Sequence, residues 1–422
     1  IMLVKKEIEL GGRIFSIETG RYAKQANGSV MVRYGDTMVL VTAVAANEAK
    51  EGLDYFPLQV EYREKTSAAG KFPGGYIKRE GRPTEKEILS ARLCDRPIRP
   101  MFPESFKNET QVIAMVMSYD GENDPDVLAA CGASAALAIS DIPFDGPIAE
   151  IRIGRIAGEL IVNPTHEQLK LSDIELVVAG TTESIMMVEG ESKEVSEKEL
   201  LDALKFAQQE IKKIVDLQNQ LRMEAGKTKW VVTEKSVDAN LKKDVYDLAE
   251  AKFKEIVYSI LAKEERSAKN KELSESVKKS LAEKYPEQEK VIGEILHDME
   301  KNLMRERILK EGIRLDGRNT TQVRPITIEL GNLPRTHGSA LFTRGETQSL
   351  TNVTLGTKDD EQTVDGLLAE YSKKFYLQYN FPPFSVGEVG RMTGVGRREI
   401  GHGNLAERSL KQVLPADELF PY

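Results

Sequence analysis

The segment Gly28–Thr37 reads GSVMVRYGDT, and 310 residues later the segment Gly338–Thr347 reads GSALFTRGET. Glycine opens both copies, apolar residues follow, and each copy ends in a glycine-centred turn beside an acidic residue. Each copy then continues into a strand-like segment, Met38–Ala45 in the first and Gln348–Leu355 in the second. Apolar and polar positions that alternate around such turns indicate antiparallel β-hairpins.

Three further blocks recur in the same order in both halves of the chain. They are a Leu-Gln pair in an aromatic-rich strand (58–59 and 377–378), a glycine-rich loop that carries arginine (74–82 and 394–403), and a helix-like segment with an arginine (90–92 and 406–408). Chance similarity rarely keeps its order over so long a stretch, so the sequence indicates a duplicated domain. The period is far too long for a solenoid of short repeats.

The second of these loops carries the strongest chemical signal. Residues 396–408 read GRREIGHGNLAER, with Arg397 and Arg398 adjacent, His402 between glycines, and Arg408 near the end. Arginine has a permanent charge and a planar fork of donors that matches phosphate oxygens, and glycine allows the backbone close to a bulky anion. The segment is suited to holding a phosphodiester, a free phosphate or both. A solvated basic turn is the alternative, and the second copy of the arrangement weakens it.

Composition limits the class of protein. A chain of 422 residues is too long for one ordinary core and predicts two or three domains. The net charge of −8 excludes a generally basic nucleic-acid coat but leaves room for a local basic groove. Cys94 and Cys131 show neither metal-ligand spacing nor a disulfide framework, which indicates buried thiols in a reducing compartment. We expect a cytoplasmic protein with no membrane segment.

No metal site is predicted within the chain. His166, His297 and His337 are scattered along the sequence and form no ligand constellation. The acidic run at 359–361 falls in an expected loop of the second copy and is not assigned a function.

Local signals predict the other elements. We expect a helix that opens at 83–86 and ends before Pro97, an alanine-rich helix over 126–139, and strands over 149–162 and 174–180. Ser196 and Glu199 form a capping-box signature that starts a long amphipathic helix. In residues 236–311 Lys and Glu dominate and Pro286 divides at least two helices, so we expect a small all-helical domain. Its charge runs favour solvated faces over an RNA-binding surface.

Seven short sequence motifs resemble those of one protein family. They are Phe72–Gly75 (FPGG), Arg79–Pro83 (REGRP), Asp95–Pro100 (DRPIRP), Arg314–Arg318 (RLDGR), His337–Phe342 (HGSALF), Arg344–Gln348 (RGETQ) and the Arg397–Arg408 segment. In this order they extend over essentially the whole chain, which thereby resembles the bacterial polynucleotide phosphorylases, built from two domains of the RNase PH type.

The resemblance implies an α+β fold. Duplicated RNase PH-like domains (ribosomal protein S5 domain 2-like), with mixed sheets and packed helices, are joined by an all-helical domain. We expect the first RNase PH-like domain at residues 1–235, the helical domain at 236–311 and the second RNase PH-like domain at 312–422. The resemblance implies 3′-to-5′ phosphorolysis of single-stranded RNA, in mRNA turnover. In this reaction the co-substrate, inorganic phosphate, attacks the last phosphodiester and releases a nucleoside 5′-diphosphate. The reaction is reversible. Phosphoryl transfer of this kind needs positioning and charge neutralisation.

The resemblance also implies the site residues. Arg397 and Arg398 match the family's paired arginines and are expected to hold the scissile or incoming phosphate. His402 is expected to contact the RNA backbone or ribose, and a structural histidine at a helix start is the alternative. Arg408 belongs to the same expected RNA-binding set.

The first copy is expected to guide RNA rather than to catalyse. Where members of the family often carry two aromatics and two arginines, this chain has Tyr76-Ile77-Lys78-Arg79. Tyr76 is expected to stack on a base, while Lys78, Arg79 and Arg82 hold the backbone. Arginines 92, 96 and 99 extend a basic path or, in the case of 96 and 99, serve a structural network with Asp95.

The family's serine-rich phosphate site, its metal-binding aspartates and its KH and S1 modules have no match before Tyr422. We therefore expect the Mg²⁺ ligands beyond Tyr422 and a truncated, weakly active or inactive form here. A homotrimer is expected for the full-length protein, with single-stranded RNA and RNA-degradation complex proteins as partners. Two alternatives stay open: a non-catalytic RNA-binding ring subunit of an exosome-like complex, and a hydrolytic exoribonuclease.

Overall fold

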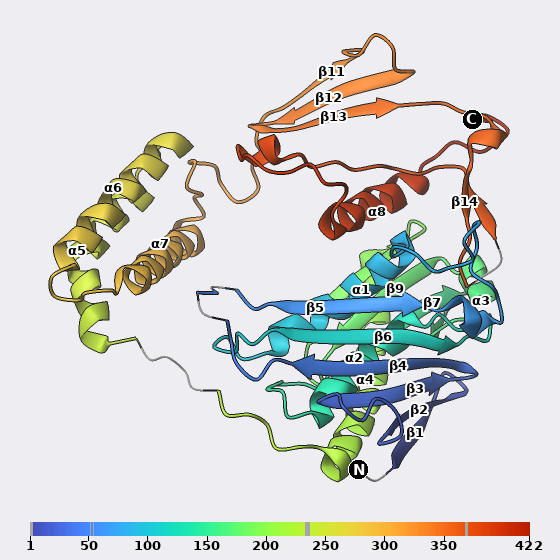
Figure 1. The fold of residues 1–422 in the computed structure, drawn as a ribbon. Coiled ribbons are helices and arrows are strands. Elements are labelled where there is room, and N and C mark those ends of the chain that lie inside the picture. Colours follow the sequence, from blue (N-terminus) through green and yellow to red (C-terminus); the bar gives the residue numbers. More distant parts are fainter. Residues whose placement is uncertain (1–2, 51, 54, 233–236, 368–369) are drawn as a thin grey trace. The chain divides into compact units, whose positions relative to one another are not determined.

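The computed structural model describes residues 3–50, 52–53, 55–232, 237–367 and 370–422. The chain forms two compact units, Ile1–Thr233 with Gly356–Tyr422, and Glu234–Leu355 (Figure 1). These units divide the chain at other points than the three predicted domains, because residues 356–422 pack with the first copy. The domain boundaries at 235/236 and 311/312 stay a prediction.

The larger sheet of the first unit has six strands. In spatial order they are β1 (Val4–Leu10), β2 (Arg13–Thr19), β3 (Gly28–Tyr34), β4 (Thr37–Ala45), β6 (Thr110–Ser118) and β5 (Leu58–Glu64). The predicted hairpins are confirmed, because β1 to β4 pair antiparallel in chain order. Among the strands of this sheet that the structure describes, only β5 and β6 pair in parallel, and α1 (Glu85–Ile98) lies between them in the chain.

A helix of small residues joins this sheet to the rest of the core. The predicted helix over 126–139 is confirmed as α2 (Asp126–Ile139), and every one of its residues is buried. It packs on β3 and β4, and the approach is close because Gly28 faces it: a Cβ at Gly28 would stand 2.0 Å from the carbonyl oxygen of Ala136. Glycine and alanine therefore set the distance between helix and sheet.

The second sheet of this unit is entirely antiparallel. Its spatial order is β10 (Ile185–Ser192), β9 (Ile174–Gly180), β7 (Ala149–Ile156) and β8 (Glu159–Val162), with the short α3 (His166–Leu171) after β8 in the chain. The capping box of Ser196 and Glu199 is confirmed at the start of α4 (Glu197–Ala225). The buried stripe of α4 packs against β7 and α2, which closes the core.

One predicted helix end is wrong. The sequence placed the end of the first helix before Pro97, whereas α1 runs to Ile98 with Pro97 inside it. Proline removes one backbone donor and disfavours the helical conformation of the residue before it. In the last turn that cost is small beside the burial of Cys94, Pro97 and Ile98 in the core.

The second unit contains three helices and a sheet. The helices are α5 (Ala239–Tyr258), α6 (Lys263–Leu281) and α7 (Glu289–Glu311), which share one apolar core. The sheet has the order β11 (Ile326–Leu330), β12 (Gly338–Arg344) and β13 (Thr347–Val353). It repeats the first copy in register, since Gly338 pairs with Val353 as Gly28 pairs with Ala43.

Residues 356–422 complete the first unit. They contain the short pair β14 (Gln362–Val364) and β15 (Tyr371–Lys373), and then α8 (Arg397–Lys411), which packs on α1 (Figure 1). None of the helices described here combines the length and the apolar character needed to span a bilayer.

Candidate nucleic-acid interface

The duplication is repeated in hydrogen bonds where α1 and α8 begin. The carboxylate of Glu87 accepts from the backbone N–H of Glu64 (2.8 Å) and of Thr84 (2.7 Å). The carboxylate of Glu399 accepts in the same way from Phe381 and Gly396, both at 2.7 Å. Glu87 fixes the start of α1 to β5, whereas Glu399 fixes the start of α8 to an irregular segment, so the strand predicted around 377–378 is wrong. The two glutamates give the register of the two helices.

The loop before α1 presents the predicted RNA-guiding residues to solvent. Tyr76 is fully exposed, and Lys78, Arg79 and Arg82 are exposed as well. Glu80 anchors the loop, because its carboxylate accepts from Lys65 Nζ (2.6 Å) and from the N–H of Thr66 (3.0 Å). The loop therefore combines a base held by Glu80 with exposed cationic and aromatic side chains.

Sequence reasoning counted only one aromatic ring in this loop. Phe72 is also 88% exposed, four residues before Tyr76. Phe72 is visible in the sequence as the first residue of the FPGG motif, but it lies outside the position where the family often carries its two aromatic residues. Two rings beside three cations are suited to stacking bases while the backbone is held by charge.

The predicted loop over 394–403 is wrong from Arg397 on, because α8 begins there with Gly396 as its N-cap. The two predicted catalytic arginines at this helix start lie in different surroundings. Arg397 donates to the carbonyl oxygen of Val60 at 2.9 Å and forms an ion pair with Glu61. Arg398 is exposed and makes no hydrogen bond or ion pair with any residue that the structure describes. Arg398 is therefore the arginine of the pair whose donors are open to a phosphate.

The other two predicted residues of α8 differ in the same way. His402 is exposed, and its ring lies 4.3 Å from the ring of Tyr379. Arg408 is partly buried and donates to Glu189 at 2.8 Å. Arg397, Arg398, His402 and Arg408 thus share one helix, whereas the other predicted residues share the loop before α1. Within the described ranges no hydrogen bond, ion pair or ring contact joins the two groups.

The arginines of α1 have protein partners. Arg99 binds Asp95 with two donors (2.6 and 3.2 Å) and also donates to the carbonyl oxygens of Phe56 and Leu58. Arg96 forms an ion pair with Glu189. These contacts agree with the structural reading of both residues.

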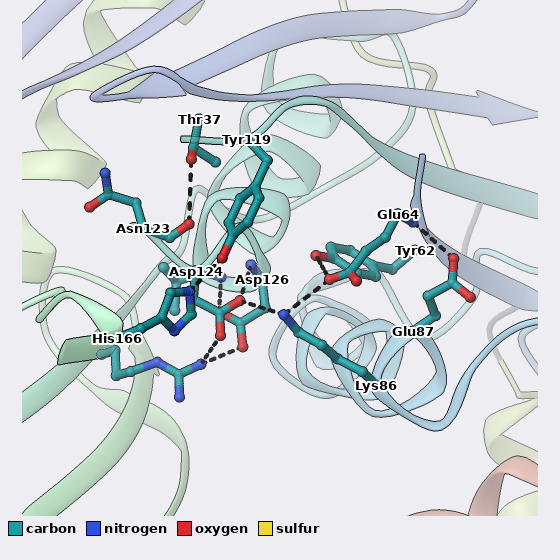
Figure 2. Close-up of polar contacts among 12 residues, drawn as sticks. Thr37, Tyr62, Glu64, Lys86, Glu87, Tyr119, Asn123, Asp124, Asp126 and His166 are labelled. Carbon is teal, nitrogen blue, oxygen red and sulfur yellow. Dashed lines mark hydrogen bonds and ion pairs between the residues drawn. The ribbon is translucent and has the colours of Figure 1, made fainter. Parts of the chain in front are cut away.

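A buried polar cluster in the first copy escaped sequence reasoning (Figure 2). Lys86 Nζ lies 3.1 Å from Glu64 and 3.4 Å from Asp124, and Arg152 forms ion pairs with Asp124 and Asp126. Burial disfavours the charged amine, but these carboxylates outweigh it and raise the pKa of Lys86. The cations and carboxylates pair with one another, with only the Nε of Arg152 left without a partner among the described residues, so the cluster is a structural network rather than an open ligand site.

His166 belongs to this network. Its Nε2 lies 2.8 Å from the hydroxyl of Tyr119, and burial lowers the pKa of its imidazole (Figure 2). The described residues contain no group of three His, Cys, Asp or Glu side chains placed to hold a metal ion.

Comparison with known proteins identifies the duplication. The family model described as 3′ exoribonuclease family, domain 1, matches residues 11–143 and 322–422, which together exceed half of the chain. The chain belongs to the 3′ exoribonuclease family. The model of domain 2 of this family matches residues 146–210. A model described as polyribonucleotide nucleotidyltransferase, RNA binding domain, matches residues 240–319.

Curated relatives with the name polyribonucleotide nucleotidyltransferase match the whole chain. The relative from Chlorobaculum parvum is 54% identical over 439 residues, covering 100% of this chain and 60% of its own length. The relative from Geobacter sulfurreducens is 54% identical over 418 residues, covering 99% of this chain and 60% of its own. The chain thus spans about 60% of the length of these relatives. A crystal structure of rice (Oryza sativa) Rrp46 aligns with 49% of this chain and 93% of its own at a TM-score of 0.41 and 15% identity.

These findings confirm two expectations from the sequence. The resemblance to the polynucleotide phosphorylases is confirmed by the relatives, and the duplicated RNase PH-like α+β fold is confirmed by the family models. The site residues stay predictions of this 3′ exoribonuclease-family chain, and the geometry above shows which of them have open donors.

Proposed function

We propose that this protein takes part in the 3′-to-5′ phosphorolytic degradation of single-stranded RNA, with inorganic phosphate as co-substrate and nucleoside 5′-diphosphates as products. The observation that carries the proposal is the exposed face of α8, where the open guanidinium of Arg398 lies one helical turn from His402. The names of the relatives and the family models support it.

In the proposed reaction a phosphate oxygen forms a bond to the terminal phosphorus while the bond from phosphorus to the 3′ oxygen breaks. The leaving oxygen takes a proton and becomes the new 3′ hydroxyl. Arg398 neutralises charge on the phosphate, and its fixed fork of donors orients the oxygens. His402 contacts the RNA backbone or ribose. For Arg397 and Arg408, which already bind carboxylates, phosphate and RNA contact remain predictions.

The loop before α1 supplies the path for RNA in this proposal. Tyr76, with Phe72 nearby in sequence, stacks bases, and Lys78, Arg79 and Arg82 hold phosphates. We propose a separate RNA contact for residues 240–319, because the family model that matches them is described as an RNA binding domain, although their charge runs alone predict solvated faces.

The chemistry of the family also implies a divalent metal. When bound, Mg²⁺ would supply charge neutralisation at the transferring phosphorus. The described residues offer no ligand set for it, so we derive no step through it, and its ligands stay an untested prediction. The homotrimer, the partners in RNA degradation and the cytoplasmic location also remain part of the proposal.

The proposal is tested with a 3′-labelled RNA and Mg²⁺, with and without inorganic phosphate. Release of labelled nucleoside diphosphate only when phosphate is present supports phosphorolysis. Release of nucleoside monophosphates, equal with and without phosphate, would show that the chain hydrolyses RNA and would overturn the proposed phosphorolysis. RNA retained by the protein without any product would favour the non-catalytic ring subunit, and absence of RNA binding would overturn all three.

A further inference from the structure

Two helices from different copies converge on one carboxylate. Glu87 and Glu399 occupy equivalent places, so the position in α1 that matches Arg408 of α8 is Arg96. The match of Arg92 with Arg408 inferred from the sequence blocks is therefore wrong by four residues, about one helical turn. Both arginines bind Glu189 of β10, one at each carboxylate oxygen, with Arg408 at 2.8 Å. Glu189 belongs to the first copy only, so a single residue serves both halves of the duplication.

The partners of α8 fix its rotation about its own axis. Arg397 contacts Val60 and Glu61, and Arg408 contacts Glu189. Between them Gly401 lies against Arg92 so closely that a Cβ there would stand 2.4 Å from the guanidinium Nε. Positions 397, 401 and 408 fall on one stripe of a helix with 3.6 residues per turn. This inner stripe faces the first copy.

The neighbouring stripe of α8 holds the residues open to a ligand. Positions 398 and 402 are spaced by one turn, are displaced by about a quarter turn from the inner stripe, and are exposed. A small rotation or shift of α8 would therefore move Arg398 and His402 together. The contacts of the inner stripe decide where both side chains point.

We propose that Glu189 is a positioning residue for the RNA and phosphate face of α8, acting through Arg408. This inference rests on the proposed function only in taking RNA as the ligand. The single negative charge of Glu189 lies between two guanidinium groups and offsets part of the repulsion between them across the packed helices. Because the Nε atoms of Arg96 and Arg408 are buried and have no partner among the described residues, the Glu189 carboxylate is the main attachment that keeps them in place.

The test uses the 422-residue chain and the substitution Glu189→Gln, with Glu191→Gln on the same strand as the matched control. Removal of a negative charge near an RNA site would by itself tighten RNA binding. Loss of the contact that positions α8 is instead expected to weaken RNA binding. We expect Glu189→Gln to raise the dissociation constant for a fluorescent single-stranded oligoadenylate about 5-fold or more, whereas Glu191→Gln leaves it unchanged or lowers it.

Two further measurements separate positioning from direct contact. Arg398→Ala is expected to lower both the affinity and the slope of log K against log salt, by about 0.7 for one phosphate on a single strand. Glu189→Gln is expected to lower the affinity and keep that slope. The double variant Glu189→Gln/Arg408→Gln is expected to lose less affinity than the two single losses combined.

An RNA-independent readout keeps this inference distinct from the proposed function. Amide hydrogen exchange over residues 397–411 is expected to be faster in Glu189→Gln than in Glu191→Gln. If the unmodified chain binds no RNA, the proposed function fails while this comparison still decides the positioning role. Equal exchange in the two variants, or RNA binding that is unchanged or tighter in Glu189→Gln, would overturn it. Should Glu189→Gln fail to fold, Arg408→Gln compared with Lys411→Gln makes the same comparison.

Discussion

The substitution Gly28→Ala tests the closest helix-to-sheet contact in the first unit. The added Cβ would stand 2.0 Å from the carbonyl oxygen of Ala136, whereas an ordinary contact there is 3.4–4 Å. The obstacle is backbone of the fully buried α2, so the helix has to recede by more than an ångström or the strand has to bend. Overpacking of this kind costs about 1–3 kcal/mol and sometimes more. Alanine also lowers the conformational entropy of the unfolded chain relative to glycine, which offsets about 0.4–1 kcal/mol of this destabilisation.

We therefore expect Gly28→Ala to lower the free energy of unfolding of the first unit by about 1–2 kcal/mol or more. At about 2–4 °C per kcal/mol for a domain of this size, the melting temperature falls by roughly 2–8 °C. The fluorescence of Trp230, the only tryptophan, reports this unfolding, because its ring packs near Phe106 at the edge of the same core.

The duplication supplies the control. Gly338 occupies the equivalent place at the start of β12, but the nearest atom to its added Cβ is Val353 Cβ at 3.7 Å. We expect Gly338→Ala to change stability by no more than about 0.5 kcal/mol. Equal melting temperatures for the unmodified chain and Gly28→Ala, or a larger loss in Gly338→Ala by circular dichroism, would refute the argument from close packing.

Three further predictions concern single side chains. Glu150 is buried, neither of its carboxylate oxygens has a hydrogen-bond partner in the described part of the chain, and burial raises its pKa well above the ordinary value. The folded state therefore retains this proton while the unfolded state loses it above about pH 4.3, so stability falls as the pH rises from there towards the folded pKa. Urea titrations between pH 4 and 8 should show Glu150→Gln gaining stability over the unmodified chain as the pH rises, and a constant difference would contradict this. Glu87→Ala removes the acceptor of two backbone N–H groups and should cost about 1–3 kcal/mol in urea unfolding, whereas the exposed Glu85→Ala should cost less than about 0.5. Tyr76→Ala should weaken binding of single-stranded RNA about 5- to 150-fold by fluorescence anisotropy if the ring stacks on a base, with the exposed Tyr55→Ala as the unaffected control.

Local sequence signals predicted the elements that local physics determines. The alanine-rich α2, the capping box at Ser196 and the paired hairpins follow from spacing within a few residues. Pro97 misled the prediction of a helix end because a rule about one residue does not include the burial that surrounds it. Residue spacing describes one helix or strand at a time. It therefore predicts the bounds of an element correctly where contacts within that element determine them.

The split within α8 could not be predicted in this way. Arg397 and Arg398 are neighbours in sequence, and nothing in the motif tells which of them meets Glu61. The partner lies 336 residues away, and only the packed fold brings it into contact. The same holds for Lys86, Asp124 and Arg152, whose network joins a helix, a loop and a strand that are separated in sequence.

The long separation between Arg397 and Glu61 has a consequence for synthesis of the chain. The six-stranded and four-stranded sheets of the first unit and helices α1 to α4 are encoded before residue 234, so they can fold on the ribosome well before α8 is made. At about 5–20 residues per second, the roughly 160 residues in between require about 8–30 s. During that interval Glu61 lacks Arg397, and Glu189 is paired with Arg96 but lacks Arg408, so another cationic side chain can bind either carboxylate before α8 is made.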